Sequence, residues 1–248
     1  MPEGPLYKKV VAGYEDNERG EDARVLAERV AERDGGELKV VHVEKGSPAD
    51  TLQALAERGE ADLVVLGSTH HAAFGSVAPG SVAEHLLHGA RCRLIIAPKG
   101  YGHEDHSQDR LRVVAVGYDG MAESQAALEE AARLATKFGG SMRVIGVATP
   151  VPAMGAGAAA QAGAEAGPDF QTRLYEAVAE LPDELRALPV LEHGDPVHKL
   201  LEAAEIGVDL LVLGSRGFGP VMRLLIGSVS SRVIRGAACP VMVVPRPG

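Results

Sequence analysis

Short, almost uninterrupted apolar runs alternate with amphipathic segments along the second half of the chain. Runs of five to seven apolar residues bounded by Gly, Pro or Asp are typical of buried strands, whereas a period near 3.6 indicates helices. The pattern predicts strands at 112–117, 141–147, 189–193, 209–213 and 240–245. It predicts helices at 122–138, 170–187, 196–206 and 228–236.

Strands without polar alternation, each followed by a helix, indicate an α/β fold with a parallel sheet covered on both faces. Crossovers in such sheets are right-handed, which gives a doubly wound arrangement. Ligands bind such sheets at the carboxyl ends of the strands, where the strand order reverses. The loops at that edge are therefore the candidate site.

The sequence repeats itself, which divides it into two domains. DLVVLGS at 62 matches DLLVLGS at 209, an offset of 147, whereas KKVVAGYED near the start matches RVVAVGYDG at an offset of 104. The first copy therefore lacks about 44 residues that the second copy has. We assign residues 1–100 to a shortened first domain and 110–248 to a complete second domain.

Composition narrows the function classes. The net charge of −9 argues against nucleic acid or an anionic membrane as a partner, and no apolar run reaches 18 residues. The start lacks the apolar core of a signal peptide, so the cytoplasm is the expected compartment. Cys92 and Cys239 precede apolar runs and are expected to be buried thiols, with a disulfide left open.

The loop GSRGFGPVMRLLIGS, residues 214–228, is the main binding candidate. Gly214 and Gly217 would let a ligand approach the backbone and would permit a positive φ, and Ser228 is the expected N-cap of the next helix. Exposed N–H groups there would bind an anion. Four arginines support this reading: Arg216, Arg223, Arg232 and Arg235. Alternatively, the glycines only make a turn and the arginines pair with surface carboxylates.

Two further positions lie at the same edge. Asp119 ends the first strand of the second copy, where its carboxylate could accept from a ribose hydroxyl or an adenine amino group. Equally, it could be a turn or helix-capping residue. Val147 could form an apolar wall for a base, or belong to the core.

These motifs resemble the universal stress protein family: GSRG, nine residues, then GS, with a first strand ending in Tyr-Asp-Gly and a last strand ACPVMVVP. The resemblance implies an adenine nucleotide α-hydrolase-like fold with strand order 3-2-1-4-5 in the second domain. It implies bound ATP, with AMP or ADP as alternatives, and Mg²⁺ or Mn²⁺ held through the phosphates. The implied site residues are Gly117, Tyr118, Asp119, Val147, Leu213, Gly214, Arg216, Gly217, Gly227, Ser228 and Val229.

The resemblance also implies how the copies assemble. Family members pair through their last strands, so Cys92–Pro98 and Cys239–Pro245 are expected to pair antiparallel within one chain as a pseudo-dimer. A further homodimer remains open. Since the missing segment contains an edge strand, the first domain could keep the order 2-1-4-5; alternatively, VVHVEKG forms a merged second and third strand.

The first copy departs from the pattern at its ligand positions. Glu15 replaces the aspartate, His70 replaces the second glycine, and His85 and His88 replace two arginines. No Lys or Arg lies between Gly67 and Ala90, so an anion would lose its charge-assisted hydrogen bonds. We expect this domain to bind nucleotide weakly or not at all. The clustered histidines leave a metal site or pH sensor as a rival interpretation.

Three function classes follow: a nucleotide-sensing binding module, a slow ATP hydrolase, and a ligand-free interaction protein. The sequence lacks a Walker GxxxxGK[ST], a GxSxG, an HExxH and a CxxC motif, and we identify no catalytic residue. The binding module is therefore the preferred prediction, with at most weak ATPase activity.

Overall fold

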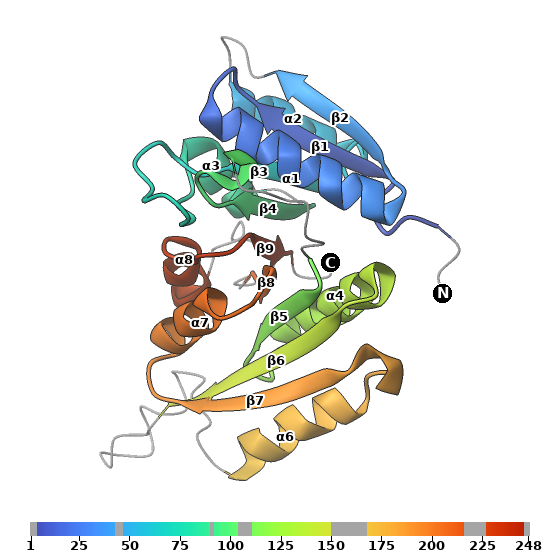
Figure 1. The fold of residues 1–248 in the computed structure, drawn as a ribbon, viewed down its shortest axis with the longest axis vertical. Coiled ribbons are helices and arrows are strands. Elements are labelled where there is room, and N and C mark those ends of the chain that lie inside the picture. Colours follow the sequence, from blue (N-terminus) through green and yellow to red (C-terminus); the bar gives the residue numbers. More distant parts are fainter. Residues whose placement is uncertain are drawn as a thin grey trace.

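A computed structural model describes residues 4–42, 47–89, 92–103, 111–149, 168–215 and 227–245. Within these residues the chain forms one nine-stranded sheet in the order β2-β1-β3-β4-β9-β8-β5-β6-β7 (Figure 1). The strands are β1 (Lys9–Tyr14), β2 (Glu37–His42), β3 (Leu63–Gly67), β4 (Arg93–Ala97), β5 (Val113–Tyr118), β6 (Ser141–Ala148), β7 (Ala187–His193), β8 (Leu210–Gly214) and β9 (Val241–Val244).

Helices cover both faces of the sheet, as the near-continuous apolar strands predict. Apolar side chains of α1, α4 and α6 belong to the core on one face, and those of α2, α3, α7 and α8 to the core on the other. The described α-helices are α1 (Glu18–Asp34), α2 (Pro48–Glu57), α3 (Ser81–Gly89), α4 (Ala122–Phe138), α6 (Pro168–Ala179), α7 (Pro196–Glu205) and α8 (Ser228–Ile234). Two 3₁₀ turns complete the described elements: η1 (Tyr101–His103) follows β4, and η2 (Asp183–Leu185) follows α6.

Local chemistry sets the ends of the two long helices. The Asn17 side chain caps α1 by accepting a hydrogen bond from the N–H of Gly20 at 3.2 Å. Gly35 and Gly139 end α1 and α4 with φ of 81° and 63°, the left-handed conformation that glycine adopts without steric cost. The boundaries of α4 are therefore those that the hydrophobic period predicts.

The predicted fold of the second domain is confirmed. Read from its free edge, the order of its strands is β7-β6-β5-β8-β9, which is 3-2-1-4-5 when the domain's own strands are numbered along the chain, and all of them are parallel. The order reverses between β5 and β8. This is the topological switch point at which doubly wound sheets bind ligands.

The antiparallel pairing of the two last strands is also confirmed. Leu94 pairs with Val243, Ile95 with Met242, and Ile96 with Val241, which joins both domains into one sheet. Figure 1 shows β4 and β9 side by side at the middle of the molecule. The pseudo-dimer is thus a continuous hydrogen-bonded structure.

The first domain keeps the shortened order β2-β1-β3-β4, with β2 at the edge. This is the arrangement expected when the third strand and its helix are missing. The alternative of a merged strand VVHVEKG lies partly outside the described residues; within them β2 pairs with β1 alone.

One helix prediction is wrong. The segment 170–187 is not a single helix, because α6 ends at Ala179 and a 3₁₀ turn and β7 follow. Pro182 lies in the break, where its ring and missing N–H do not permit a helix to continue. The other predicted boundaries differ by at most two residues.

The interface between the domains buries a carboxylate with three partners. Glu130 on α4 is 3% exposed, and it accepts hydrogen bonds from Tyr7 and Arg93 of the first domain. Arg93 Nη2 lies 3.0 Å from Glu130 Oε2, and Arg133 Nη1 lies 2.9 Å from the same oxygen. This cluster links β4 to α4 across the interface.

Both cysteines are free and buried, as expected for structural thiols. Burial raises the pKa of Cys92 to about 11 and that of Cys239 to about 12. Because the thiolate is the nucleophile, we expect neither to react with a thiol reagent near about pH 8 in the native protein. In denaturant both should react, as an absorbance titration would measure; a fast native reaction would contradict the burial.

No helix of the described residues is long and apolar enough to cross a bilayer.

Candidate functional site

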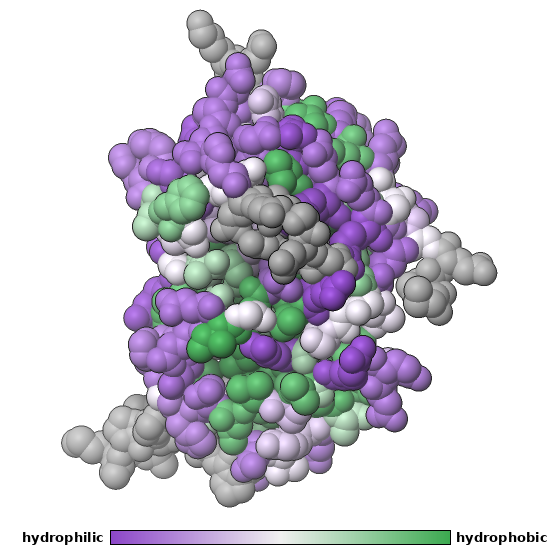
Figure 2. Space-filling model, viewed as in Figure 1, coloured by the Kyte–Doolittle hydropathy of each residue, from purple (hydrophilic) through white to green (hydrophobic). Residues whose placement is uncertain are grey.

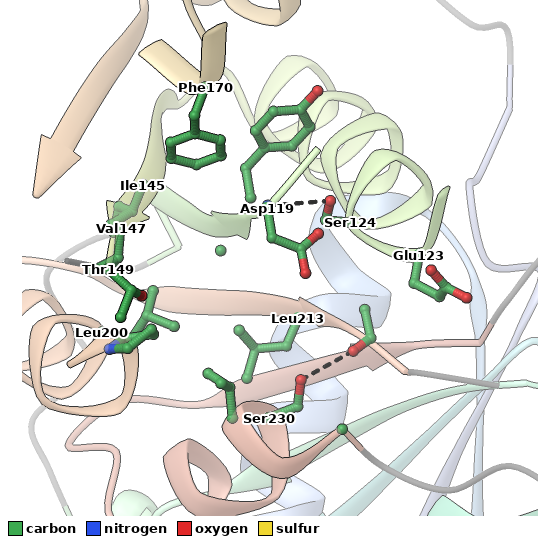
Figure 3. A pocket seen from close by; sticks show the side chains of 16 residues that line it. Asp119, Glu123, Ser124, Ile145, Val147, Thr149, Phe170, Leu200, Leu213 and Ser230 are labelled. Carbon is green, nitrogen blue, oxygen red and sulfur yellow. Dashed lines mark hydrogen bonds between the residues drawn. The ribbon is translucent and has the colours of Figure 1, made fainter. Parts of the chain in front are cut away.

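A hollow opens at the switch point, at the carboxyl ends of β5, β6 and β8 (Figure 3). Its volume is about 970 Å³ when the open mouth is included. The lining residues are Gly117, Tyr118, Asp119, Glu123, Ser124, Ile145, Val147, Thr149, Phe170, Pro196, Leu200, Leu213, Gly214, Gly227, Val229 and Ser230. The hollow therefore gathers segments that are far apart in the sequence.

The middle of the hollow is apolar. Ile145 and Val147 come from β6, Phe170 from α6, Leu200 from α7 and Leu213 from β8. Figure 3 shows Phe170 and the β6 side chains on one side, with Leu213 opposite them. In Figure 2 apolar surface gathers on the second-domain half of this face, whereas the first-domain half is mostly polar. Such walls suit the flat apolar faces of a ring system.

A short turn places the carboxylate of Asp119 at one end of the hollow. Asp119 Oδ1 accepts from the N–H of Met121 at 3.0 Å, and the N–H of Asp119 donates to Ser124 Oγ at 3.3 Å. Gly120 completes the turn with a φ of 79°. Asp119 is therefore a turn residue, as one interpretation of the sequence predicted. The turn also holds the Asp119 carboxylate at the wall of the hollow, where this carboxylate can accept a hydrogen bond from a hydroxyl or amino group. Burial raises the pKa of the neighbouring Tyr118 above its usual value.

The other end of the hollow is formed by Gly214 and the start of α8. Gly227, Val229 and Ser230 line it, and Ser230 Oγ donates to the carbonyl of Gly214 at 3.1 Å. Ser228 is the first residue of α8 and does not line the hollow; the N-cap is Gly227. The predicted capping role of Ser228 is thus wrong by one position.

Close packing requires a glycine at position 214, which the sequence alone did not reveal. A Cβ at this position would lie 2.3 Å from the backbone oxygen of Glu123, at the start of α4. The φ of Gly214 is not positive, so the conformational part of the prediction is wrong. The close approach is to the chain's own backbone, which presses the end of β8 against α4.

Part of the predicted phosphate loop lies outside the described residues, namely Arg216, Gly217 and Arg223, as does the Ala/Gly-rich segment 150–167. Arg235 is described, and its Nη2 lies 2.7 Å from Glu84 Oε1 of the first domain. The alternative of pairing with a carboxylate therefore holds for this arginine.

The first domain has a smaller counterpart of about 510 Å³ at the equivalent edge. Glu15, at the place of Asp119, forms an ion pair there with Arg19 and accepts from Asn17 Nδ2 at 2.7 Å. Both charged side chains line this hollow. Arg19 thus neutralises the carboxylate that a nucleoside would need, and it takes part of the space.

The turn beneath this counterpart is rebuilt. Asp16 stands where the second domain has Gly120 and does not adopt a positive φ. The chain takes another path, on which a Cβ at Gly20 would lie 1.9 Å from the backbone oxygen of Glu15. The second domain has Ser124 at the place of Gly20, so the two turns are not interchangeable.

The histidines of the first domain do not assemble into a metal site within the described residues, which contain no suitable group of three His, Cys, Asp or Glu. His85 Nε2 lies 2.9 Å from Gln53 Oε1 on α2, and His88 Nδ1 donates to the carbonyl of Glu84. Each of these two rings thus has a local partner. The rival interpretation as a metal site is not supported.

Several lining residues were missed from the sequence: Glu123, Ser124, Ile145, Thr149, Phe170, Pro196, Leu200 and Ser230. Ser124 and Ser230 could have been found from their spacing, since each stands within a few residues of a predicted site residue. Phe170 and Leu200 carry no such signal. Their helices reach the hollow only through the crossovers of the sheet.

The fold and the hollows define a class: a tandem of two doubly wound α/β domains, of which the second has the larger crevice at its switch point and the first a smaller counterpart. The sequence profile of the Universal stress protein family matches residues 2–98 and 110–245. The chain belongs to the universal stress protein family.

Similar proteins agree with this assignment. A universal stress protein of Mycolicibacterium smegmatis is 29% identical over 249 residues, covering 98% of this chain and 82% of that protein. A universal stress protein of Mycobacterium tuberculosis is 30% identical over 225 residues, covering 86% and 74%. The relatives thus match across both domains.

Solved structures show the same fold. A universal stress protein of Archaeoglobus fulgidus superposes with a TM-score of 0.60 at 25% identity, covering 90% of this chain and 77% of that one. A functionally unknown protein of Pseudomonas aeruginosa has a TM-score of 0.69 at 13% identity, covering 97% and 93%. The latter likeness concerns the fold alone.

Proposed function

We propose that the second domain binds an adenine nucleotide, ATP in the first place and AMP or ADP as alternatives, and serves as a nucleotide-sensing module. The single observation that carries this proposal is the hollow at the switch point, with apolar walls in its middle and Asp119 at one end. Such crevices in doubly wound sheets are the usual place for nucleotides.

The proposed orientation follows from the chemistry of the two ends. The base lies between the apolar walls near Val147 and Phe170, and Asp119 accepts from the nucleoside. The phosphates extend toward Gly214 and the first turn of α8, whose N–H groups carry a partial positive charge. Mg²⁺ or Mn²⁺ would be held through the phosphates.

A binding module is favoured over a hydrolase. Asp119 lies at the nucleoside end in this orientation, away from the bond that hydrolysis would break. Glu123 is the other acidic residue of the lining, and Figure 3 shows its carboxylate directed away from the centre of the hollow. Neither carboxylate is therefore placed to activate water at the phosphates.

Replacing Asp119 by alanine is expected to weaken ATP binding by roughly 10- to 100-fold, since hydrogen bonds to a charged group contribute about 1.5–3 kcal/mol. Isothermal titration calorimetry of the full chain measures the dissociation constant and the number of sites. The wild type is expected to show one site per chain.

Glu15→Ala is the matched control, because Glu15 stands at the same position of the first domain and is already paired with Arg19. We expect it to leave the affinity unchanged. Two equivalent sites in the wild type, or no heat of binding at all, would contradict the proposal.

A further inference from the structure

The helix α8 connects the hollow of the second domain to the first domain. Its first residues line the hollow, and the turn after its last residue contacts the other half of the chain. The carbonyl of Ala237 accepts a hydrogen bond from the N–H of Val77 at 2.8 Å. Arg235 pairs with Glu84 at 2.7 Å. A helix of only seven residues thus has the ligand hollow at one end and the first domain at the other.

The first-domain side of this contact is firmly held. Ser68 Oγ donates to the carbonyl of Ala97 at 2.7 Å and accepts from the N–H of Ala78 at 3.0 Å. These bonds fix the loop 68–80 to the end of β4. Val77, at the tip of the contact, is fully buried and belongs to the same core cluster as Ala237.

The loop 68–80 occupies the position at which the first copy lost its nucleotide-binding pattern, because it is the counterpart of the glycine loop after β8. In the first domain this loop presses against the turn after α8, where the N–H of Val77 donates to the carbonyl of Ala237.

We propose that Val77 and Glu84 are positioning residues for the nucleotide site of the second domain, acting through α8. The inference rests on the proposed nucleotide binding. So short a helix has little stability by itself and depends on tertiary contacts, which are the burial of Val233 and Ile234 in the core and the contacts with the first domain beyond its last residue. Glu84→Ala removes the ion pair with Arg235, and Val77→Ala reduces side-chain packing in the core that Val77 shares with Ala237 while keeping the backbone hydrogen bond. Weakening these contacts lets the first turn of α8 shift, and that turn is where the phosphates are expected.

The expected effect depends on the ligand, which separates positioning from a general loss of stability. Because the first turn of α8 faces the phosphate end, loosening it weakens ATP, whereas adenosine uses the apolar walls and Asp119 alone. A role in stability only would leave both affinities unchanged, or lower both equally, in protein that remains folded.

The test compares Glu84→Ala, Val77→Ala and their combination with the wild type, using calorimetric titrations of ATP and of adenosine. We expect the combined variant to bind ATP roughly 3- to 10-fold more weakly, a typical change for residues that couple two sites, with adenosine affinity unchanged. Glu28→Ala is the control, since Glu28 and Glu84 are each 40% exposed and each pairs with an arginine. Equal losses for both ligands, or no loss for ATP, would overturn the proposal.

A second measurement does not need the nucleotide. Hydrogen exchange of the free protein is expected to be faster at the amides of 231–237 in the combined variant, while the amides of α4 keep their protection. If wild-type protein binds no ATP but α8 exchanges faster, the proposed function fails and the support of α8 by the first domain stands. Unchanged exchange would refute that support.

Discussion

Replacing Glu130 by alanine is expected to lower the free energy of unfolding by about 3–5 kcal/mol, the cost of removing one partner of a buried ion pair. Glu130 is 3% exposed and accepts from Arg93, Arg133 and Tyr7. Without its carboxylate, the guanidinium of Arg93 and the Tyr7 hydroxyl would lose a charged acceptor at the domain interface. A buried donor without an acceptor keeps its full desolvation penalty.

Denaturant unfolding of the full chain measures this loss, and Glu129→Ala is the control. Glu129 is the next residue of α4, but it is exposed, so its replacement is expected to change stability by less than about 0.5 kcal/mol. The double variant Glu130→Ala, Arg93→Ala should lose less than the sum of the single variants, because the two residues interact directly. Strict additivity, or a small effect of Glu130→Ala, would contradict the role of the cluster.

The same cluster has a signature at alkaline pH. Burial, followed by the nearby Glu130, raises the pKa of Tyr7 well above its usual value. The unfolded chain releases this proton near about pH 10, whereas the folded chain keeps it, so stability falls as the pH rises above about 10. Tyr7→Phe should remove that part of the pH dependence.

The fold could be predicted from the sequence because the chain contains two copies of one domain, and each copy shows which segments the other has or lacks. The change of offset from 147 to 104 showed where the first copy is shorter, and the resemblance to the universal stress protein family implied the antiparallel pairing of the last strands. Both are properties of whole segments, so an error of one or two residues at the end of an element does not change the predicted fold. The wrong end of α6 came from extending a helical pattern across Pro182.

The site was predictable only where a short motif carries it. Asp119 and Gly214 follow directly from strand ends, whereas Phe170 and Leu200 reach the hollow from helices on opposite faces of the sheet. The pair of Arg19 with Glu15 could not be predicted from the loop after the third strand, because Arg19 lies in the first turn of α1. Side chains that meet through tertiary packing leave no local pattern to read.

Gly67→Ala and Gly214→Ala are both expected to destabilise the protein, by about 1–3 kcal/mol or more. A Cβ at Gly67 would lie 2.1 Å from the backbone oxygen of Arg19, and one at Gly214 would lie 2.3 Å from that of Glu123. Real side chains do not approach backbone atoms so closely, so the strand end or the helix start must move. The two positions are equivalent in the repeat, although only one of them lines the proposed nucleotide site.

Gly80→Ala provides the control, since a Cβ there would meet no atom within 4 Å and the φ of Gly80 is not positive. We expect its stability to stay close to that of the wild type in thermal unfolding. If the glycines served only the ligand, Gly67→Ala would be nearly harmless, because the first domain is expected to bind nucleotide weakly or not at all. A loss at both positions would mean that these glycines are needed first for packing strand against helix, and that the proposed ligand site of the second domain uses a packing constraint that both domains share.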